Sequence, residues 1–162
     1  MNTAIRKHSN YTFLAVLALC FVLLPVAGQF VPVQTSAGGQ RSAMGAVRSQ
    51  VGALQNATRT ARNFVTGGYD VVWQQFDSLR NAFSDFLLSL SPRQTSDGAN
   101  ELAELNSGLH IIGEAFSNYQ NDIESGRSPK AALDDLCQVL NQASRVWLQE
   151  FNKDCSRLHV GW

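Results

Sequence analysis

The sequence has few of the residues from which catalytic and metal-binding sites are usually built. Its 162 residues include 3 cysteines and 3 histidines, and neither a glycine-rich phosphate loop nor a nucleophile-elbow motif occurs. Basic and acidic residues balance at 13 each, so the chain lacks the excess of Lys and Arg that binds nucleic acid phosphates. No alternating apolar and polar stretch is long enough to predict a strand. We therefore expect an all-α protein that is not an enzyme and binds no metal, cofactor or nucleic acid.

Residues 1–28 predict a secretory signal peptide. A short positive segment precedes an apolar run at residues 13–24, and small residues follow at 26–28. Charge, apolar run and small residues in this order are typical of a cleaved signal, and the run is shorter than the about 20 residues of a membrane-spanning helix. An uncleaved anchor that extends to Val33 is the alternative. We expect a secreted, extracellular protein that begins with a flexible leader at residues 29–41.

Residues 42–162 predict an antiparallel bundle of three to four amphipathic helices. Apolar side chains recur every three or four residues along four segments, which places them on one stripe of each helix. The connections between segments are short, as between antiparallel neighbours. The four stripes are Met44, Val47, Val51, Leu54, Thr58, Ala61 and Val65; Tyr69, Val72, Phe76, Leu79, Phe83, Phe86 and Leu90; Leu102, Leu105, Leu109, Ile112, Phe116, Tyr119 and Ile123; and Leu133, Leu136, Cys137, Leu140, Ala143, Trp147, Leu148 and Phe151.

Glycine, proline and capping residues predict where the helices begin and end. The first helix is expected at residues 42–66, ended by Gly67 and Gly68, with Asp70 as the cap of the second. Because the first stripe continues in register into the second, one long kinked helix is the alternative. The second helix should end before Pro92.

The second half of the chain carries similar signals. Residues 93–100 predict a loop, in which Asp97 or Asn100 caps the third helix. Gly126 should end that helix, and Ser128-Pro129 should begin the fourth.

The stripes also predict how the helices pack. The first is built from small residues and should lie close to its neighbours, and the second and third should form the central seam. Val139 and Val146 lie beside the stripe of the fourth helix. Its apolar surface is therefore broad, and we expect it to touch two neighbours.

Cys137 and Cys155 are the two cysteines that remain after signal removal. An unbroken helix would hold them on the same face but about 27 Å apart, whereas a disulfide needs Cα atoms about 4.4–6.8 Å apart. Two free thiols, an intermolecular bond and an internal bridge remain as alternatives. We favour the internal bridge, and with it a break in the fourth helix, because cysteines of secreted proteins usually pair.

Three other features have both a functional and a structural interpretation. Asn56-Ala57-Thr58 matches the N-glycosylation acceptor pattern, which is weak evidence. His110 and Glu114 lie one turn apart but lack further metal ligands, which favours a surface pair. The segment 41–62 holds four arginines and no acid. We favour packing beside acidic helices over a basic face for an anionic membrane or an acidic partner.

Two functional hypotheses follow. In the first, the bundle acts by protein–protein interaction or self-association, which the heptad-like spacing of the second and third stripes favours. In the second, it carries an apolar ligand or binds a lipid surface, which the aromatic residues of the stripes favour. Aromatic side chains at helical spacing are usually core, and lipid-surface helices usually carry Lys and Arg on their polar face. We therefore favour the first.

Overall fold

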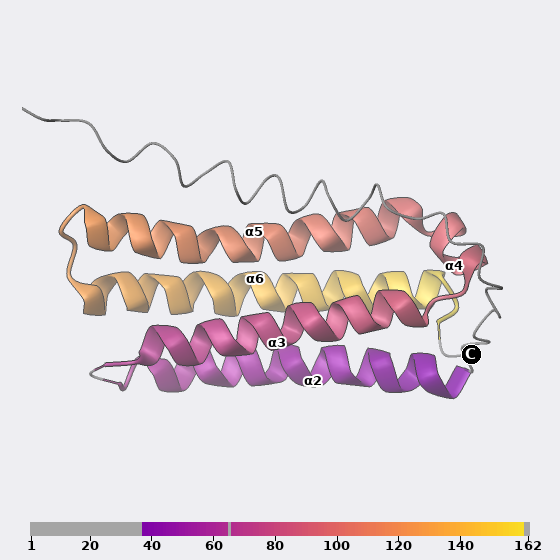
Figure 1. The fold of residues 1–162 in the computed structure, drawn as a ribbon, viewed down its shortest axis with the longest axis horizontal. Coiled ribbons are helices and arrows are strands. Elements are labelled where there is room, and N and C mark those ends of the chain that lie inside the picture. The colour runs from indigo at the N-terminus through magenta and orange to yellow at the C-terminus, as the bar shows by residue number, and fades with distance from the viewer. Residues whose placement is uncertain (1–36, 65, 161–162) are drawn as a thin grey trace, which may run out of the picture. The chain divides into compact units, whose positions relative to one another are not determined.

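The computed structural model describes residues 37–64 and 66–160, which form an all-α bundle. The predicted signal peptide, the leader up to residue 36, Val65 and Trp162 lie outside the described residues. Consecutive long helices run in opposite directions along one axis (Figure 1). The helices are α2 (Ala37–Ala61), α3 (Gly68–Ser89), α4 (Pro92–Asp97), α5 (Ala99–Glu124) and α6 (Pro129–Arg157).

The predicted stripes form the core. Every described stripe residue is buried or half-buried, and most of their side chains belong to one contiguous apolar cluster. The first helix begins at Ala37 instead of residue 42, so the last five residues of the predicted leader are helical. The first turn of α2 therefore includes Gly38 and Gly39, although glycine weakens a helix. Gln40 of the same turn holds it in place, because its side chain is buried and hydrogen-bonded to Ser89 at the end of α3 and to Gln94 of the segment after it.

The α2–α3 connection rules out one long kinked helix. α2 ends at Ala61, and Gly67 adopts φ 78°, a left-handed conformation that favours glycine. Gly68 is the first residue of α3. A Cβ atom at this position would lie 2.7 Å from Leu133 Cδ2 and 2.8 Å from the Ala61 carbonyl oxygen, so a larger residue would clash there. Gly67 is the N-cap, so the prediction of Asp70 in this position was wrong.

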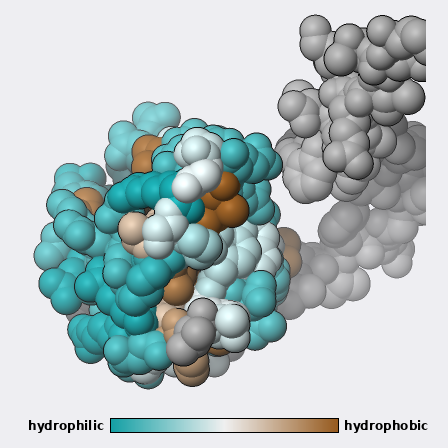
Figure 2. All heavy atoms as spheres, turned by 90° about the vertical axis from the view of Figure 1, so that its left-hand side faces the viewer, coloured by the Kyte–Doolittle hydropathy of each residue, from teal (hydrophilic) through white to brown (hydrophobic). Residues whose placement is uncertain are grey.

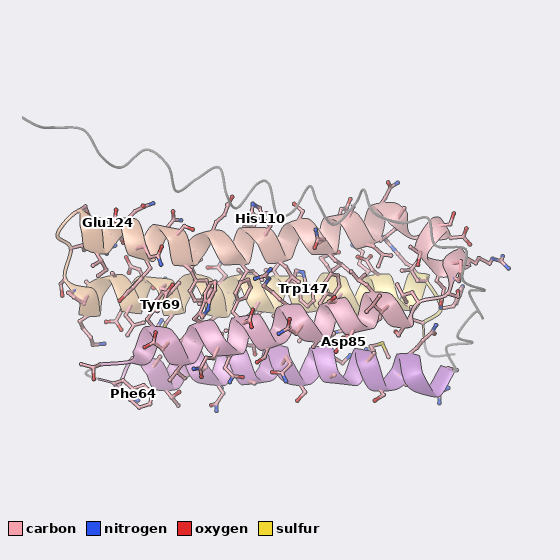
Figure 3. The ribbon with its side chains drawn as sticks, in the orientation of Figure 1. Phe64, Tyr69, Asp85, His110, Glu124 and Trp147 are labelled. Atoms are coloured by element: carbon pink, nitrogen blue, oxygen red, sulfur yellow. The ribbon has the colours of Figure 1, made fainter. Side chains whose placement is uncertain are left out.

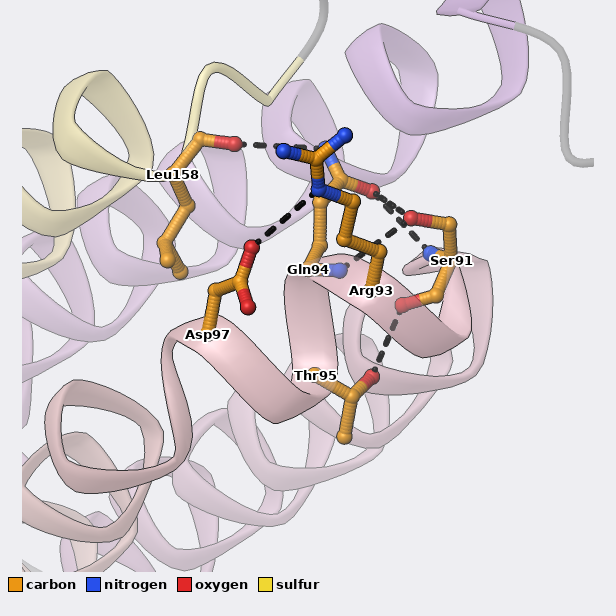
Figure 4. A network of polar contacts seen from close by, with 6 residues as sticks. All are labelled: Ser91, Arg93, Gln94, Thr95, Asp97 and Leu158. Atoms are coloured by element: carbon orange, nitrogen blue, oxygen red, sulfur yellow. Dashed lines mark hydrogen bonds and ion pairs between the residues drawn. The ribbon is translucent and has the colours of Figure 1, made fainter.

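The predicted loop at residues 93–100 contains the short helix α4. Ser91 Oγ accepts a hydrogen bond from the Gln94 backbone N–H, and Gln94 Oε1 accepts from the Ser91 N–H, a reciprocal capping box that starts a helix (Figure 4). Gly98 then caps α5 without a side-chain bond, so the predictions of Asp97 and Asn100 as caps were wrong.

Gln94 also ties together the helix ends at this side of the bundle. Its Oε1 accepts from Gln40 Nε2 of α2 at 2.8 Å, and its Nε2 donates to the Leu158 carbonyl oxygen after α6 at 3.3 Å. Gln40 Nε2 in turn donates to the carbonyl oxygen of Ser89 at the end of α3. The start of α2 and the end of α6 therefore meet at the end that carries α4 (Figures 1 and 4).

The ends of α5 and α6 follow one geometry, the Schellman motif. Gly126 has φ 86° after α5, as the sequence predicts for the residue that ends this helix, and Arg127 N–H donates to the Asp122 carbonyl oxygen. After α6, His159 has φ 49° and Val160 N–H donates to the Cys155 carbonyl oxygen. Val160 is thereby turned into the core. Ser128 and Pro129 begin α6 as predicted.

The packing order differs from the expected central seam. α2 lies close to α3 and α6, as its small residues predict, and α5 lies close to α6. The α3 and α5 backbones are farther apart, and aromatic rings fill the space between them, including Phe116, whose ring centroid lies 4.9 Å from that of Trp73 and 5.2 Å from that of Phe76. The residues of the predicted central seam are buried as expected, but α3 and α5 are not a close pair, because large rings hold the two backbones apart.

Candidate functional site

A groove runs along the outer side of the α5–α6 pair and has a volume of about 450 Å³. That volume lies within the range of about 300–1,000 Å³ that is typical of small-molecule sites. By contrast, the end of the bundle formed by the α2–α3 and α5–α6 connections is mostly hydrophilic, with hydrophobic residues only in separate spots (Figure 2). The groove is therefore our candidate site.

Two stripes on α6 explain why this groove exists. The first faces the core and includes Leu140, Trp147 and Phe151. The second, one step around the helix, carries Val139 and Val146, which are 49% and 56% exposed. The sequence predicts a second neighbour for this stripe, and no described residue buries it. Ile111 of α5, 59% exposed, extends the same apolar surface across the groove.

Trp147 forms the floor of the groove and fixes the spacing of its two walls. Its side chain reaches from α6 to α5, where Nε1 donates a hydrogen bond of 2.7 Å to the Leu105 carbonyl oxygen. A Cβ atom at position 108 would lie 2.7 Å from Trp147 Cδ1, so only glycine lets the indole lie this close to α5. The Trp147 ring stacks on Phe151 at 5.3 Å between centroids, which connects the floor to the core.

Acidic side chains line one end of the groove. Glu104 of α5 and Glu150 and Asp154 of α6 are lining residues, whereas no Lys, Arg or His lines it. Asp154 is only 3% exposed, and burial raises the pKa of its carboxyl group, with Arg157 opposing the shift. Arg157 Nη1 lies 3.4 Å from Asp154 Oδ1. The groove is apolar along most of its length and ends in a buried carboxylate. It can therefore bury the apolar part of a ligand and form a charge-assisted hydrogen bond with a cationic group at the end of that ligand.

The lining side chains are otherwise hydrocarbon, indole and amide groups, and no hydroxyl, thiol or imidazole is among them. This lining favours burial of apolar surface over nucleophilic chemistry. In the described part of the chain, no group of three or more His, Cys, Asp or Glu residues is arranged to hold a metal ion. His110 Nε2 and Glu114 Oε1 lie 3.6 Å apart with both side chains well exposed, and His110 points away from the bundle (Figure 3).

The cysteines correct a sequence prediction. α6 is unbroken from Pro129 to Arg157, so Cys137 and Cys155 lie five turns apart on one helix, and both are free and buried. The internal bridge that we favoured is therefore wrong for this fold, for the geometric reason that an unbroken helix holds the two thiols about 27 Å apart. Burial raises the pKa of both thiols, that of Cys155 to about 12.

The other predicted site residues do not converge on the groove. Asn56 is exposed on α2 while Thr58 of the same acceptor pattern is buried, with its hydroxyl bonded to the Gln55 carbonyl oxygen. Glycosylation at Asn56 stays a prediction. Two arginines of the segment 41–62 contact α6: Arg48 Nε donates to Asn152 Oδ1, and Arg62 Nη2 donates to the Asp134 carbonyl oxygen. These contacts favour the structural interpretation of the basic segment.

Comparisons with known proteins add no family or function. No protein-family model matches this sequence, no curated protein matches it, and no solved structure matches it. Within the described residues, no helix has both the length and the apolar content needed to cross a membrane. The arguments for function therefore rest on the groove itself.

Proposed function

We propose that this protein is an exported, non-catalytic helical bundle that binds a protein partner or a second copy through the α5–α6 groove. The observation that carries the proposal is the apolar second stripe of α6, where Val139 and Val146 remain exposed beside Ile111. Scattered apolar residues are normal on a protein surface, but these three line one concave surface together. Such a surface is typical of a groove that receives the apolar face of another helix.

The energetics favour a reversible complex. Complete burial of an aliphatic side chain contributes about 1.5–3 kcal/mol, so covering three half-exposed ones contributes about 3 kcal/mol in all. Association costs at least about 4 kcal/mol in lost translational and rotational freedom. The apolar stripe alone cannot hold a partner, and polar contacts at the rim must supply the rest.

Site-specific photo-crosslinking tests the proposal. Benzoylphenylalanine replaces Val146, and the protein is irradiated in the material into which its native host secretes it. Covalent adducts should form there, either with one partner protein or with a second copy. The same group at Leu88, which is 77% exposed on α3, serves as the control and should give none. Equal adduct yields at the two positions would contradict a specific role for the groove. Edman or mass analysis of the same material should place the mature N-terminus near Gln29 if the protein is exported through a cleaved signal.

A carrier of an apolar ligand is the second candidate function. The volume of the groove and the indole at its floor favour it. Organic extraction of the natively purified protein followed by mass spectrometry should then release a stoichiometric apolar compound, and Val146→Arg should abolish its retention. A lipid-surface role would instead require a change in helix content or tryptophan emission when anionic vesicles are added.

A further inference from the structure

We infer that the occupant of the groove is an amphipathic helix of a partner protein, and that a Lys or Arg beyond its apolar face is received by Asp154. This inference rests on the proposed function and specifies the chemistry of the partner. It follows from the order of residues along the groove, the surroundings of Asp154 and the charge of the rim.

The groove is laid out for a helix. Val139 and Val146 are seven residues apart on α6, or about 10 Å along its axis, and Glu150 and Asp154 continue the same line at steps of four. A docked helix presents apolar side chains at i, i+3 or i+4 and i+7, which matches this spacing. Its next residue on the same face then lies beside the carboxylates.

Asp154 is placed to receive a cation. Its carboxylate is a lining group of the groove although the residue is only 3% exposed. Oδ1 contacts Arg157, whose own side chain is 56% exposed. A nearly buried carboxylate gains from a further cationic donor, because a charge-assisted hydrogen bond offsets the desolvation of the ionised form. Glu150 and Glu104 place further negative charge around the same end.

A second copy of this chain fits the groove poorly. Two grooves placed against each other would bring their acidic rims together, with no Lys or Arg of the lining to offset the repulsion. The basic helix α2 has no large exposed apolar side chain, since those of the described chain are Phe64, Trp73, Leu88, Ile111, Val139 and Val146. Among the described helices, α6 has exposed valines and a basic residue, Arg157, in its last turn, but those valines line the groove itself beside Glu150. Pairing two copies through α6 would therefore again bring acidic rims together, which favours a helix of another protein as the occupant.

Selection from a phage-displayed library of amphipathic helices tests the inference. The library keeps leucines at heptad spacing and randomises the positions of the following turn. Selection on the wild-type protein should enrich Lys or Arg at one randomised position. Asp154→Asn should lose this preference and bind the selected peptides about tenfold or more weakly, because a charge-assisted contact is removed. Asp85→Asn, which removes an exposed carboxylate from α3, is the matched control and should leave binding unchanged.

The possible failures separate the two proposals. If Val146→Arg enriches the same helices as the wild type, or the wild type enriches none, the groove does not bind helices and the proposed function in this form fails. If wild type enriches apolar helices without a basic residue, or Asp154→Asn binds the selected peptides as well as wild type, only the inference about the cation is overturned. Circular dichroism confirms that each variant is folded.

Discussion

Two identical substitutions, Gly108→Ala and Gly52→Ala, should change stability in opposite directions. Alanine in an exposed helix interior is favoured over glycine by about 1 kcal/mol, and a Cβ atom at Gly52 meets nothing within 4 Å, so this variant should gain that amount. At Gly108 the new Cβ atom would lie 2.7 Å from Trp147 Cδ1 and 3.3 Å from its Nε1. Moving the indole costs about 1–3 kcal/mol in overpacking and weakens its hydrogen bond to Leu105, worth about 1 kcal/mol. The net loss should be about 1–3 kcal/mol.

Urea unfolding followed by far-ultraviolet circular dichroism measures both changes in the free energy of unfolding. A second background, Trp147→Phe, removes the contacting part of the indole, and there Gly108→Ala should lose most of its cost, which gives a double-mutant cycle for the pair. The reasoning is refuted if Gly108→Ala stabilises the wild-type protein as much as Gly52→Ala does. In that case α5 and α6 would not be held apart by the indole, and the groove floor would not be rigid.

Three further changes test other features. Burial raises the native pKa of Asp154, so the protonated form stabilises the fold at low pH and this contribution is lost as pH rises through the native pKa. Asp154→Asn should therefore become increasingly more stable than wild type as pH rises from about 3.8, and a gap that shrinks with pH in urea titrations would contradict this. Because burial raises the pKa of Cys155 to about 12, its thiol should resist iodoacetamide at neutral pH and react only after unfolding, as intact mass will report. Gln94→Ala should lower the free energy of unfolding by about 1–2 kcal/mol through loss of the capping box and of the bonds to α2 and Leu158, whereas Thr95→Ala should change it by less than about 0.5 kcal/mol in the same urea experiment.

The sequence predicted the core well because burial on a helix has a strong period. The four stripes, the end of α5 at Gly126 and the start of α6 at Pro129 all follow from local residue chemistry. The position of α2 close to its neighbours followed from its small side chains. These features depend on residues within a few positions of one another, so they can be inferred without knowing the rest of the fold.

The wrong predictions concern features that depend on distant parts of the chain. Ser91 and Gln94 form a capping box, but without Gln40 and Leu158 in view their segment resembles a polar loop. The disulfide preference applied a rule about secreted proteins where the helix geometry was already against it. α6 does touch two neighbours, α2 and α5, as its broad apolar surface predicted, but Val139 and Val146 belong to neither contact and stay exposed among the described residues. The acidic end of the groove was missed because Glu104 and Asp154 are far apart in sequence.

The contact between α2 and α6 has a consequence for the way the chain is made. Lys130 Nζ donates to the Arg62 carbonyl oxygen at one end of this pair, and Arg48 contacts Asn152 farther along it. The first described helix is therefore covered by the last described one, whose 29 residues leave the ribosome after those of α2, α3 and α5. A nascent chain can pair α2 with α3 early, but the face of α2 that packs on α6 stays open to water until α6 has been made. Closure of the core around α2 therefore waits for α6, however early α2 and α3 have paired.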